Sequence, residues 1–254
     1  MIKIYGQPLS RAARPLWMAH ELGLKFENIP VVANDPNYDD INPNRKMPFM
    51  VDSDGTTMFE SLAISQYLVR QYGKEHPISP QNNYEEAALL QWSMWVMTEM
   101  DMRLHEIGCI LMPEGAHMWG SEDGYKKYFG RPKSKERLQR LINELQFPLG
   151  VLNKALAKTP FLAGDRFTAA DLNASVVMAW LIPEIVPLDA FPNIQPWLEK
   201  CFDREHCPFN RTQRPSWAKR VALSDVPGSK RQSAKQFPMY VFDVDGFNER
   251  YGKL

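Results

Sequence analysis

The feature of the sequence that most constrains its fold is a change of hydrophobic pattern after Tyr72. Before that point, short apolar runs typical of strands alternate with stretches of helical periodicity. From Tyr84 onwards the pattern is helical only. The segment between, residues 73–83, is polar and contains Pro77 and Pro80, which is typical of a linker. The sequence therefore predicts an α/β unit followed by an all-α unit.

The order of elements in the first unit indicates a mixed sheet. Strands are expected at residues 2–5, 26–32, 48–51 and 56–59, and helices from Ser10 and from about Glu60. Because a helix separates the first two strands, we expect them to pair in parallel. The turn sequence Asp52-Ser53-Asp54-Gly55 favours an antiparallel hairpin between the last two strands.

The second unit carries two long helical patterns and one strong signal for the start of a helix. The first pattern runs from Tyr84 to about Met112 and is rich in Trp and Met, and the second runs from Lys135 to Ala157. Further along, Thr168 and Asp171 have the spacing of a capping box. The sequence therefore predicts a helix that begins within a residue or two of Thr168.

Composition and charge exclude several classes of protein. The 30 Lys and Arg residues balance the 30 Asp and Glu residues, which argues against a nucleic-acid partner. The longest apolar run is too short to cross a bilayer, so no membrane association is expected. Three cysteines suit a reducing compartment, and the spacing of Cys201, His206 and Cys207 does not fit a zinc site. We expect a cytoplasmic protein without a metal.

Three short segments carry residues suited to an anionic, extended ligand. Ser10 begins a helix, where a hydroxyl can cap the helix or donate a hydrogen bond to an anion such as a thiolate. Ser61 begins another helix, whose N–H groups suit a carboxylate, and Glu60 can pair with an amine on the same ligand. A cis bond before Pro48 would let the backbone of Met47 pair with an extended ligand. Taken singly, each segment has a plainer explanation, as a helix cap or a proline at the start of a strand.

Together these segments resemble the glutathione S-transferase family. The resemblance covers residues 1 to about 202 and rests on the stretches Asn42-Pro43-Asn44-Arg45-Lys46-Met47-Pro48, Asp54-Gly55, Glu60-Ser61-Leu62-Ala63-Ile64, Phe161-Leu162-Ala163-Gly164-Asp165 and Phe167-Thr168-Ala169-Ala170-Asp171. It implies a thioredoxin-like α/β N-terminal domain (residues 1–76), an all-α helical C-terminal domain with a hydrophobic substrate pocket (84–222) and a C-terminal extension (223–254). It also implies glutathione as co-substrate, a small-molecule electrophile as second substrate, a detoxification role and a homodimer.

The resemblance assigns roles to residues near the thiol of glutathione. Ser10 matches the serine that activates this thiol in the serine-type classes of the family. Lys46 matches a contact to the glycyl carboxylate. Met47 matches the residue whose backbone pairs with the cysteinyl part, and Pro48 matches the cis-proline.

The resemblance also assigns roles at the γ-glutamyl end of glutathione. Glu60 and Ser61 match the pair that holds this end. Asp101, or alternatively Glu99, is expected to reach the γ-glutamyl amine of the ligand bound to the partner subunit.

Three positions raise questions about the thiol. Arg45 stands where the family pattern has glycine, and Arg11 directly follows Ser10, so both add charge near the thiol. Tyr5 lies at the end of the first strand, where the tyrosine-type classes keep their catalytic hydroxyl. The residues around Ser10 fit the serine type better, so we expect Ser10 rather than Tyr5 to act.

The expected chemistry follows from the pKa of a thiol. A free cysteine thiol has a pKa of about 8.5, so little thiolate exists at neutral pH. A hydroxyl hydrogen bond and a helix N-terminus both favour the thiolate, which then attacks a bound electrophile. Leu9, Trp95 and Met102 are candidates for the apolar pocket, although Trp and Met at helical spacing are also common in cores and dimer interfaces.

Three activities remain open at the level of sequence. The first is conjugation of glutathione to an electrophile by a glutathione S-transferase. The second is a glutathione-dependent lyase or dehalogenase that cleaves an aryl ether or a carbon–halogen bond, such as a specialised bacterial member, which the long C-terminal extension favours. The third is a glutathione-binding module without catalysis.

Overall fold

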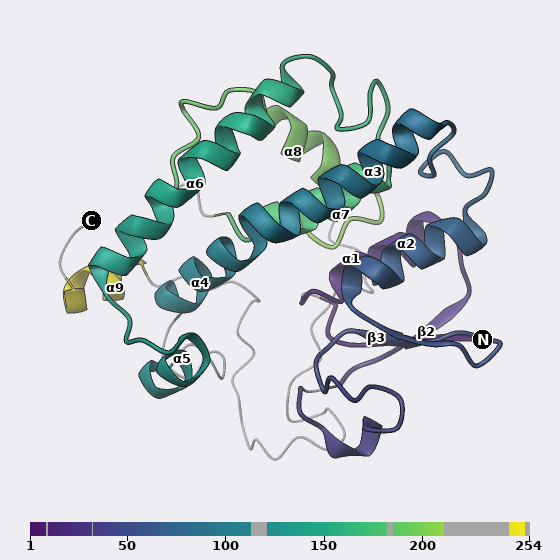
Figure 1. The fold of residues 1–254 in the computed structure, drawn as a ribbon, viewed down its shortest axis with the longest axis horizontal. Helices are drawn as coiled ribbons and strands as arrows, with labels where there is room; N and C mark the ends of the chain where they lie inside the picture. The colour runs from purple at the N-terminus through teal and green to yellow at the C-terminus, as the bar shows by residue number, and fades with distance from the viewer. Residues whose placement is uncertain (9, 32, 113–120, 182–184, 211–243, 252–254) are drawn as a thin grey trace.

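The computed structural model describes residues 1–8, 10–31, 33–112, 121–181, 185–210 and 244–251. Figure 1 shows a small sheet with two helices on one side and a bundle of longer helices beside it. This arrangement confirms the predicted fold class, a thioredoxin-like α/β unit joined to an all-α unit. The domain boundaries at residues 76, 84 and 222 stay predictions, and most of the expected extension (223–254) lies outside the described residues.

The sheet has four strands in the order β2-β1-β3-β4. Their bounds are β1 Ile2–Tyr5, β2 Phe26–Ile29, β3 Phe49–Val51 and β4 Thr57–Phe59. As predicted, β1 pairs in parallel with β2, and β3 and β4 form an antiparallel hairpin. Strand β2 ends three residues earlier than expected, because Pro30 has no N–H to continue the ladder.

Two helices cover one face of this sheet (Figure 1), namely α1 (Ala13–Glu21) and α2 (Ser61–Tyr72). Ile4 of β1 is fully buried in the core that includes these helices, whereas Tyr5 belongs to a second, smaller cluster. This alternation is what a strand with both faces covered requires. Helix α1 begins three residues later than predicted, because Ser10 starts a turn before the helix rather than the helix itself.

The described part of the second unit is mainly helical. Its helices are α3 (Asn83–Val96), a π-helix (Met97–Asp101), α4 (Met102–Leu111), α5 (Glu122–Phe129), α6 (Lys135–Leu156), α7 (Ala169–Met178), α8 (Ile194–Phe202) and α9 (Val244–Tyr251). The pattern from Tyr84 to Met112 is thus two helices joined by a π-helix, which turns Met100 and Asp101 inward together. Within the described ranges, no helix has the length and apolar composition that a membrane span would need.

Helix α7 lies at the centre of the helical unit, and each of its ten residues is buried. It begins with the predicted capping box, in which the Thr168 side chain accepts from the helix backbone and Asp171 accepts from the Thr168 N–H at 2.9 Å. Asp171 also accepts from the Leu162 N–H at 2.8 Å and from the Trp197 indole N–H at 3.0 Å. This helix start therefore joins three segments of the helical unit.

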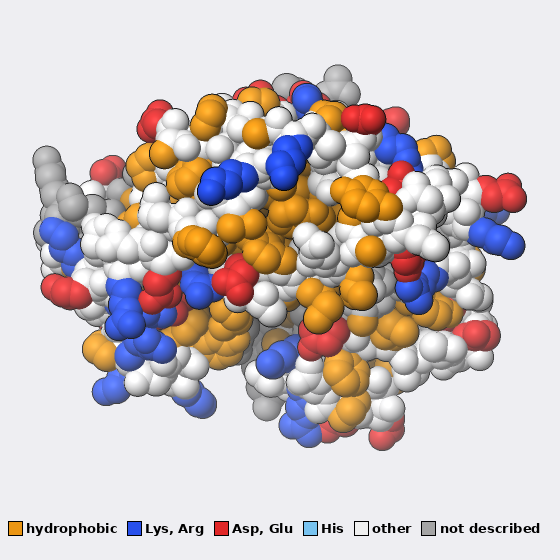
Figure 2. Space-filling view, turned by 45° about the horizontal axis from the view of Figure 1, so that its top comes forward, with side chains coloured by type: hydrophobic (Ala, Val, Ile, Leu, Met, Phe, Trp, Pro, Cys, Tyr) orange, Lys and Arg blue, Asp and Glu red, His pale blue; other side chains and the backbone are white. Residues whose placement is uncertain are grey.

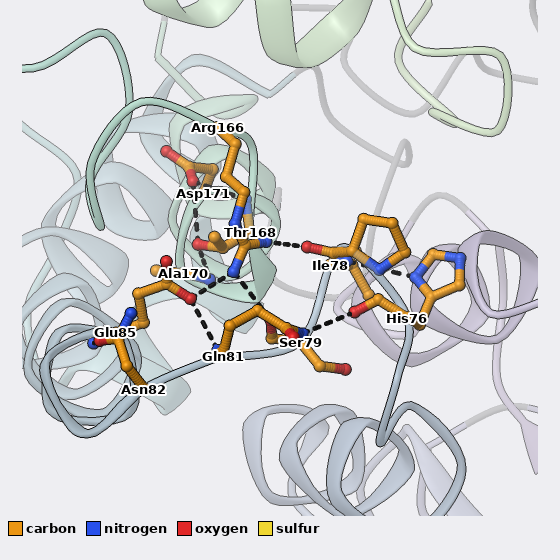
Figure 3. A network of polar contacts seen from close by, with 11 residues as sticks. His76, Ile78, Ser79, Gln81, Asn82, Glu85, Arg166, Thr168, Ala170 and Asp171 are labelled. Carbon is orange, nitrogen blue, oxygen red and sulfur yellow. Dashed lines mark hydrogen bonds and ion pairs between the residues drawn. The ribbon is translucent and has the colours of Figure 1, made fainter.

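The segment between the two units is held by contacts with the start of α7 (Figure 3). Arg166 donates to the carbonyl groups of Pro77 and Ser79 and forms an ion pair with Glu85. The Ala169 N–H donates to the Ile78 carbonyl at 2.8 Å. A linker was predicted here, and the structure shows that it is fixed to the helical unit.

Candidate functional site

Ser10 lies in the turn that leads into α1. Its hydroxyl donates to the Gln7 carbonyl at 2.8 Å and accepts from the Ala12 N–H at 3.1 Å. The side chain is half-buried. Its oxygen therefore lies at the N-terminal end of α1, where the helix dipole favours a negative charge.

Tyr5, the alternative candidate, is enclosed on the other side of the sheet. Its ring stacks on Phe49 with 4.4 Å between centroids and meets the edge of Tyr38 at 5.4 Å. Burial is the main cause that raises the pKa of Tyr5, and the nearby Tyr38 and Glu27 add to it. With only 6% of the residue exposed, a thiol has little access to this phenol, which favours Ser10 as the thiol activator.

The peptide bond between Met47 and Pro48 is cis, as predicted. This segment packs against the loop that follows β1. A Cβ atom on Gly6 would lie 2.6 Å from the Cβ of Ala12 and 3.5 Å from that of Pro48, so only glycine fits there. Among the described residues Met47 makes no backbone–backbone hydrogen bond, which leaves its N–H and carbonyl for an extended ligand.

The turn before Met47 explains one departure from the family pattern. Arg45 has a φ of +52°, in the left-handed region that favours glycine, and its N–H donates to the Asn42 carbonyl at 3.0 Å. Its guanidinium is turned away to pair with Asp39. Lys46 is exposed, and its carbonyl accepts from the Asn42 amide at 2.6 Å. The turn thus leaves the Lys46 ammonium in solvent.

Helix α2 begins at Ser61 without a side-chain cap from any described residue. Glu60, which precedes it, has a φ of +74° and an exposed side chain that accepts from the Asn44 amide at 3.4 Å. Ser61 is buried, and its hydroxyl oxygen accepts from Arg14 at 2.6 Å. This helix start therefore offers free N–H groups and a fixed hydroxyl, which suit a carboxylate.

Comparison with known proteins decides the family. Residues 10–71 match the N-terminal domain of glutathione S-transferases, and residues 100–205 match the C-terminal domain of the same enzymes. Together the two matches cover most of the chain and both halves of the fold. The chain belongs to the glutathione S-transferase family.

Individual relatives agree with this assignment. A glutathione S-transferase-like protein, gedE of Aspergillus terreus, is 29% identical over 223 residues, which cover 80% of this chain and 91% of that protein. Glutathione S-transferase 1 of wheat, Triticum aestivum, is 29% identical over 219 residues, which cover 80% of this chain and 90% of that protein. The solved structure of glutathione transferase URE2P6 from Phanerochaete chrysosporium, in complex with oxidized glutathione, is 25% identical in sequence. It superposes with a TM-score of 0.65 over 81% of this chain and 92% of that chain. These matches support glutathione transferase activity, as the sequence predicts.

In this transferase, Asp101 is engaged by its own chain. Both oxygens of its carboxylate accept from Arg11, at 3.3 Å and 2.5 Å, and only 5% of Asp101 is exposed. The ion pair joins the turn after Ser10 to the π-helix, and so joins the two units. Glu99, the alternative to Asp101, lies near Arg103 instead.

Of the residues expected to line the electrophile pocket, the structure describes Trp95 and Met102, and neither is fully buried. Met102 is 48% exposed, and Trp95 is half-buried against Trp92 with 5.2 Å between ring centroids. Leu9 lies outside the described residues. The exposure of Met102 fits the alternative that sequence reasoning left open, a surface of the helical unit that meets another subunit.

Sequence reasoning missed Arg14, which lies directly behind Ser61. It is fully buried and follows Ser10 by only four residues. Arginine is almost never buried completely unless it is paired, so Arg14 was not expected inside the protein. Its position on the apolar side of α1, next to Ala13, Leu16 and Trp17, was the available signal.

Proposed function

We propose that this glutathione S-transferase is of the serine type and binds glutathione along the cis-proline edge of its sheet. The observation that carries the proposal is the convergence of three segments. Gly6 in the loop before Ser10 packs against Pro48, and Asn44 links the turn before Met47 to Glu60. The thiol activator and both ends of the peptide site therefore adjoin one another.

Glutathione would lie extended across this edge. The backbone of Met47 pairs with the cysteinyl part, and the exposed Lys46 ammonium meets the glycyl carboxylate. At the other end, the N–H groups at the start of α2 and the Ser61 hydroxyl receive the γ-glutamyl carboxylate, and Glu60 receives the amine. The role of Asp101 toward the partner subunit's ligand stays a prediction, because its carboxylate is bonded to Arg11 here.

The chemistry assigned to Ser10 requires one change in its hydrogen bonding. In the structure its hydroxyl proton goes to the Gln7 carbonyl. On binding glutathione, the hydroxyl turns that proton toward the sulfur and keeps accepting from the Ala12 N–H. The thiol loses its proton to solvent, and the thiolate, favoured by this bond and by the end of α1, then attacks a small electrophile held beside it and displaces its leaving group.

We test the catalytic role of Ser10 with Ser10→Ala. We expect kcat to fall roughly tenfold or more. The loss of the hydroxyl should raise the pKa of the bound thiol, and each unit of this rise costs about 1.4 kcal/mol of thiolate stabilisation, which is a factor of about ten. Glutathione affinity, measured by calorimetry, should change much less. Equal losses in turnover and affinity would show that Ser10 only positions the peptide. Tyr5→Phe serves as the control and should leave the bound thiol's pKa unchanged.

The same assays separate the three activities by their products. A retained conjugate with a generic aryl halide supports conjugation. Release of halide or phenol without a retained conjugate would instead indicate a lyase or dehalogenase. Tight glutathione binding without turnover on any electrophile would indicate a binding module.

We also propose that the transferase is a homodimer formed through the outer face of α3 and α4. Leu90, Met94 and Met102 are each about half exposed there, at 51%, 56% and 48%. Figure 2 shows hydrophobic side chains gathered across the middle of one face of the molecule, which is typical of an interaction surface. Light scattering at micromolar concentration should give the mass of two chains, and Met94→Glu should give the mass of one. A single-chain mass for the unmodified protein would contradict the proposal.

A cytoplasmic location completes the proposed function. Cys109, Cys201 and Cys207 are free and buried, which suits the reducing compartment in which glutathione is kept as a thiol. Detoxification of electrophiles is the role that this chemistry supports.

A further inference from the structure

The guanidinium of Arg14 lies inside the protein rather than at its surface. It is fully buried, and its Nη1 donates to the Ser61 hydroxyl at 2.6 Å. Its Nη2 donates to the Asn173 carbonyl at 3.2 Å and to the Met97 sulfur at 3.5 Å. Arg14 therefore ties α1 to the first residue of α2, to the π-helix and to α7.

The acceptors that hold Arg14 are all uncharged. Among the described residues no carboxylate accepts a hydrogen bond from it, and its Nε has no partner. Burial lowers the pKa of Arg14 to about 10, and the charges of Asp101 and Glu60 partly offset this effect, so the group is a cation at neutral pH. A buried cation that lacks a hydrogen-bonded counterion is costly to hold, so an anion brought nearby is bound favourably.

The bond from Arg14 also determines what Ser61 can do. A hydroxyl has one proton to donate, and Arg14 occupies an acceptor position on the Ser61 oxygen. Ser61 donates to no acceptor among the described residues, so its proton is available to a ligand. It lies at the start of α2, where the first N–H groups of the helix are also free of a side-chain cap from the described chain.

Arg14 is held in place from behind by a buried polar network. Asn173 of α7 accepts from Ser65 at 2.8 Å and donates to Ser93 at 3.0 Å, while its carbonyl accepts from Arg14. Asn173, Ser65 and Ser93 are fully buried. The position of the guanidinium is thus set by the helical unit before any ligand binds.

We propose that Arg14 is a positioning residue for the γ-glutamyl carboxylate of glutathione. It fixes the Ser61 hydroxyl so that the hydroxyl proton points to that carboxylate, and it supplies the positive charge behind it. Arg14 itself touches neither the carboxylate nor the thiol. The inference rests on the proposed function, in which glutathione places its γ-glutamyl end at the start of α2.

The test compares two peptides and two variants by calorimetry. The peptides are glutathione and an analogue in which hydrogen replaces the γ-glutamyl α-carboxylate (4-aminobutanoyl-cysteinyl-glycine). The variants are Arg14→Met and, as the matched control, Arg70→Met, which removes an exposed guanidinium near the other end of α2. We expect Arg14→Met to weaken glutathione binding roughly ten- to a hundredfold, as for loss of a hydrogen bond to a charged group, and to leave analogue binding nearly unchanged. Arg70→Met should change neither.

Kinetics give a second readout that a merely structural role would not produce. In Arg14→Met the KM for glutathione should rise, while kcat at saturating glutathione stays within about twofold, because the thiol is not touched. The double variant Arg14→Met with Ser61→Ala should lose less binding free energy than the sum of the two single losses, because part of the effect of Arg14 passes through the Ser61 hydroxyl. Additive losses would show that Arg14 does not act through Ser61.

The remaining outcomes are decisive as well. Equal weakening of both peptides, or no weakening of either in a folded Arg14→Met protein, would overturn the inference and leave the proposed function standing. If circular dichroism shows that Arg14→Met does not fold, Arg14→Lys replaces it and should weaken glutathione binding selectively and by less. An unmodified protein that binds neither peptide would overturn the proposed function, and the inference with it.

Discussion

Two helix starts in this transferase are built in opposite ways. The start of α7 is closed from within the chain: Thr168 accepts from the Ala170 N–H, Asp171 accepts from the Thr168 N–H, and both side chains lie inside the protein. The start of α2 has no side-chain cap from the described residues, and Glu60 before it takes a positive φ. The difference indicates that the first helix start serves stability and that the second is left for a ligand.

The largest expected effect is at the closed helix start. Asp171→Ala removes a carboxylate that accepts from Leu162, Thr168 and Trp197. Because those buried donors would then lack partners, we expect the free energy of unfolding to fall by about 3–5 kcal/mol. Denaturant unfolding measures the loss. The folded Asp171→Ala protein should still bind glutathione. If this variant instead lost glutathione affinity without losing stability, the start of α7 would have a role in binding, and the comparison would be wrong.

The next effect is at the open helix start, where glutathione should supply the missing partners. At a hundred times its dissociation constant, glutathione should raise the free energy of unfolding by about 2.7 kcal/mol. Hydrogen exchange would show where the protection arises. We expect the first turn of α2 to gain protection and the first turn of α7 to gain none, and equal gains at both would contradict the comparison.

The smallest expected effect distinguishes the contribution of the Thr168 hydroxyl to stability from that of the Asp171 carboxylate. Thr168→Ala removes the hydroxyl that accepts from the Ala170 N–H at 3.3 Å but keeps Asp171 in place. We expect a loss of about 1 kcal/mol of stability, as for a typical N-cap, with glutathione affinity unchanged. Thermal unfolding and calorimetry on the same sample check both, with Thr168→Ser as the control that keeps the hydroxyl.

Several features of the fold and of the candidate site could be predicted from the sequence, because each depends on residues that lie close together along the chain. The capping box needs only residues three apart. The adjacent residues left the isomer of the Met47–Pro48 bond open, and the family resemblance pointed to the cis form that the structure shows. The parallel pairing of β1 with β2 and the hairpin of β3 and β4 followed from the helix and the turn that connect them, whereas the pairing of β1 with β3 was not predicted. Local patterns of this kind fix the positions of Ser10, Pro48 and Ser61 without knowledge of the rest of the chain.

The features that were missed depend on distant contacts. Arg14 is bonded to Ser61, 47 residues further on, and to Asn173, 159 residues further on, so its burial is decided by packing between the units. The π-helix that turns Asp101 inward toward Arg11 is likewise invisible in the periodicity. The short helix α5 escaped prediction because most of its residues are polar.

The contacts of Arg166 have a consequence for how the enzyme moves. Since its guanidinium holds the carbonyl groups of Pro77 and Ser79, the segment between the two units is fixed to the helical unit and is not a flexible linker. The ion pair of Arg11 with Asp101 and the hydrogen bond of Arg14 to Asn173 cross directly between the units, so they resist rotation of one unit against the other. We therefore expect substrate entry to involve rearrangement of individual side chains rather than a hinge motion.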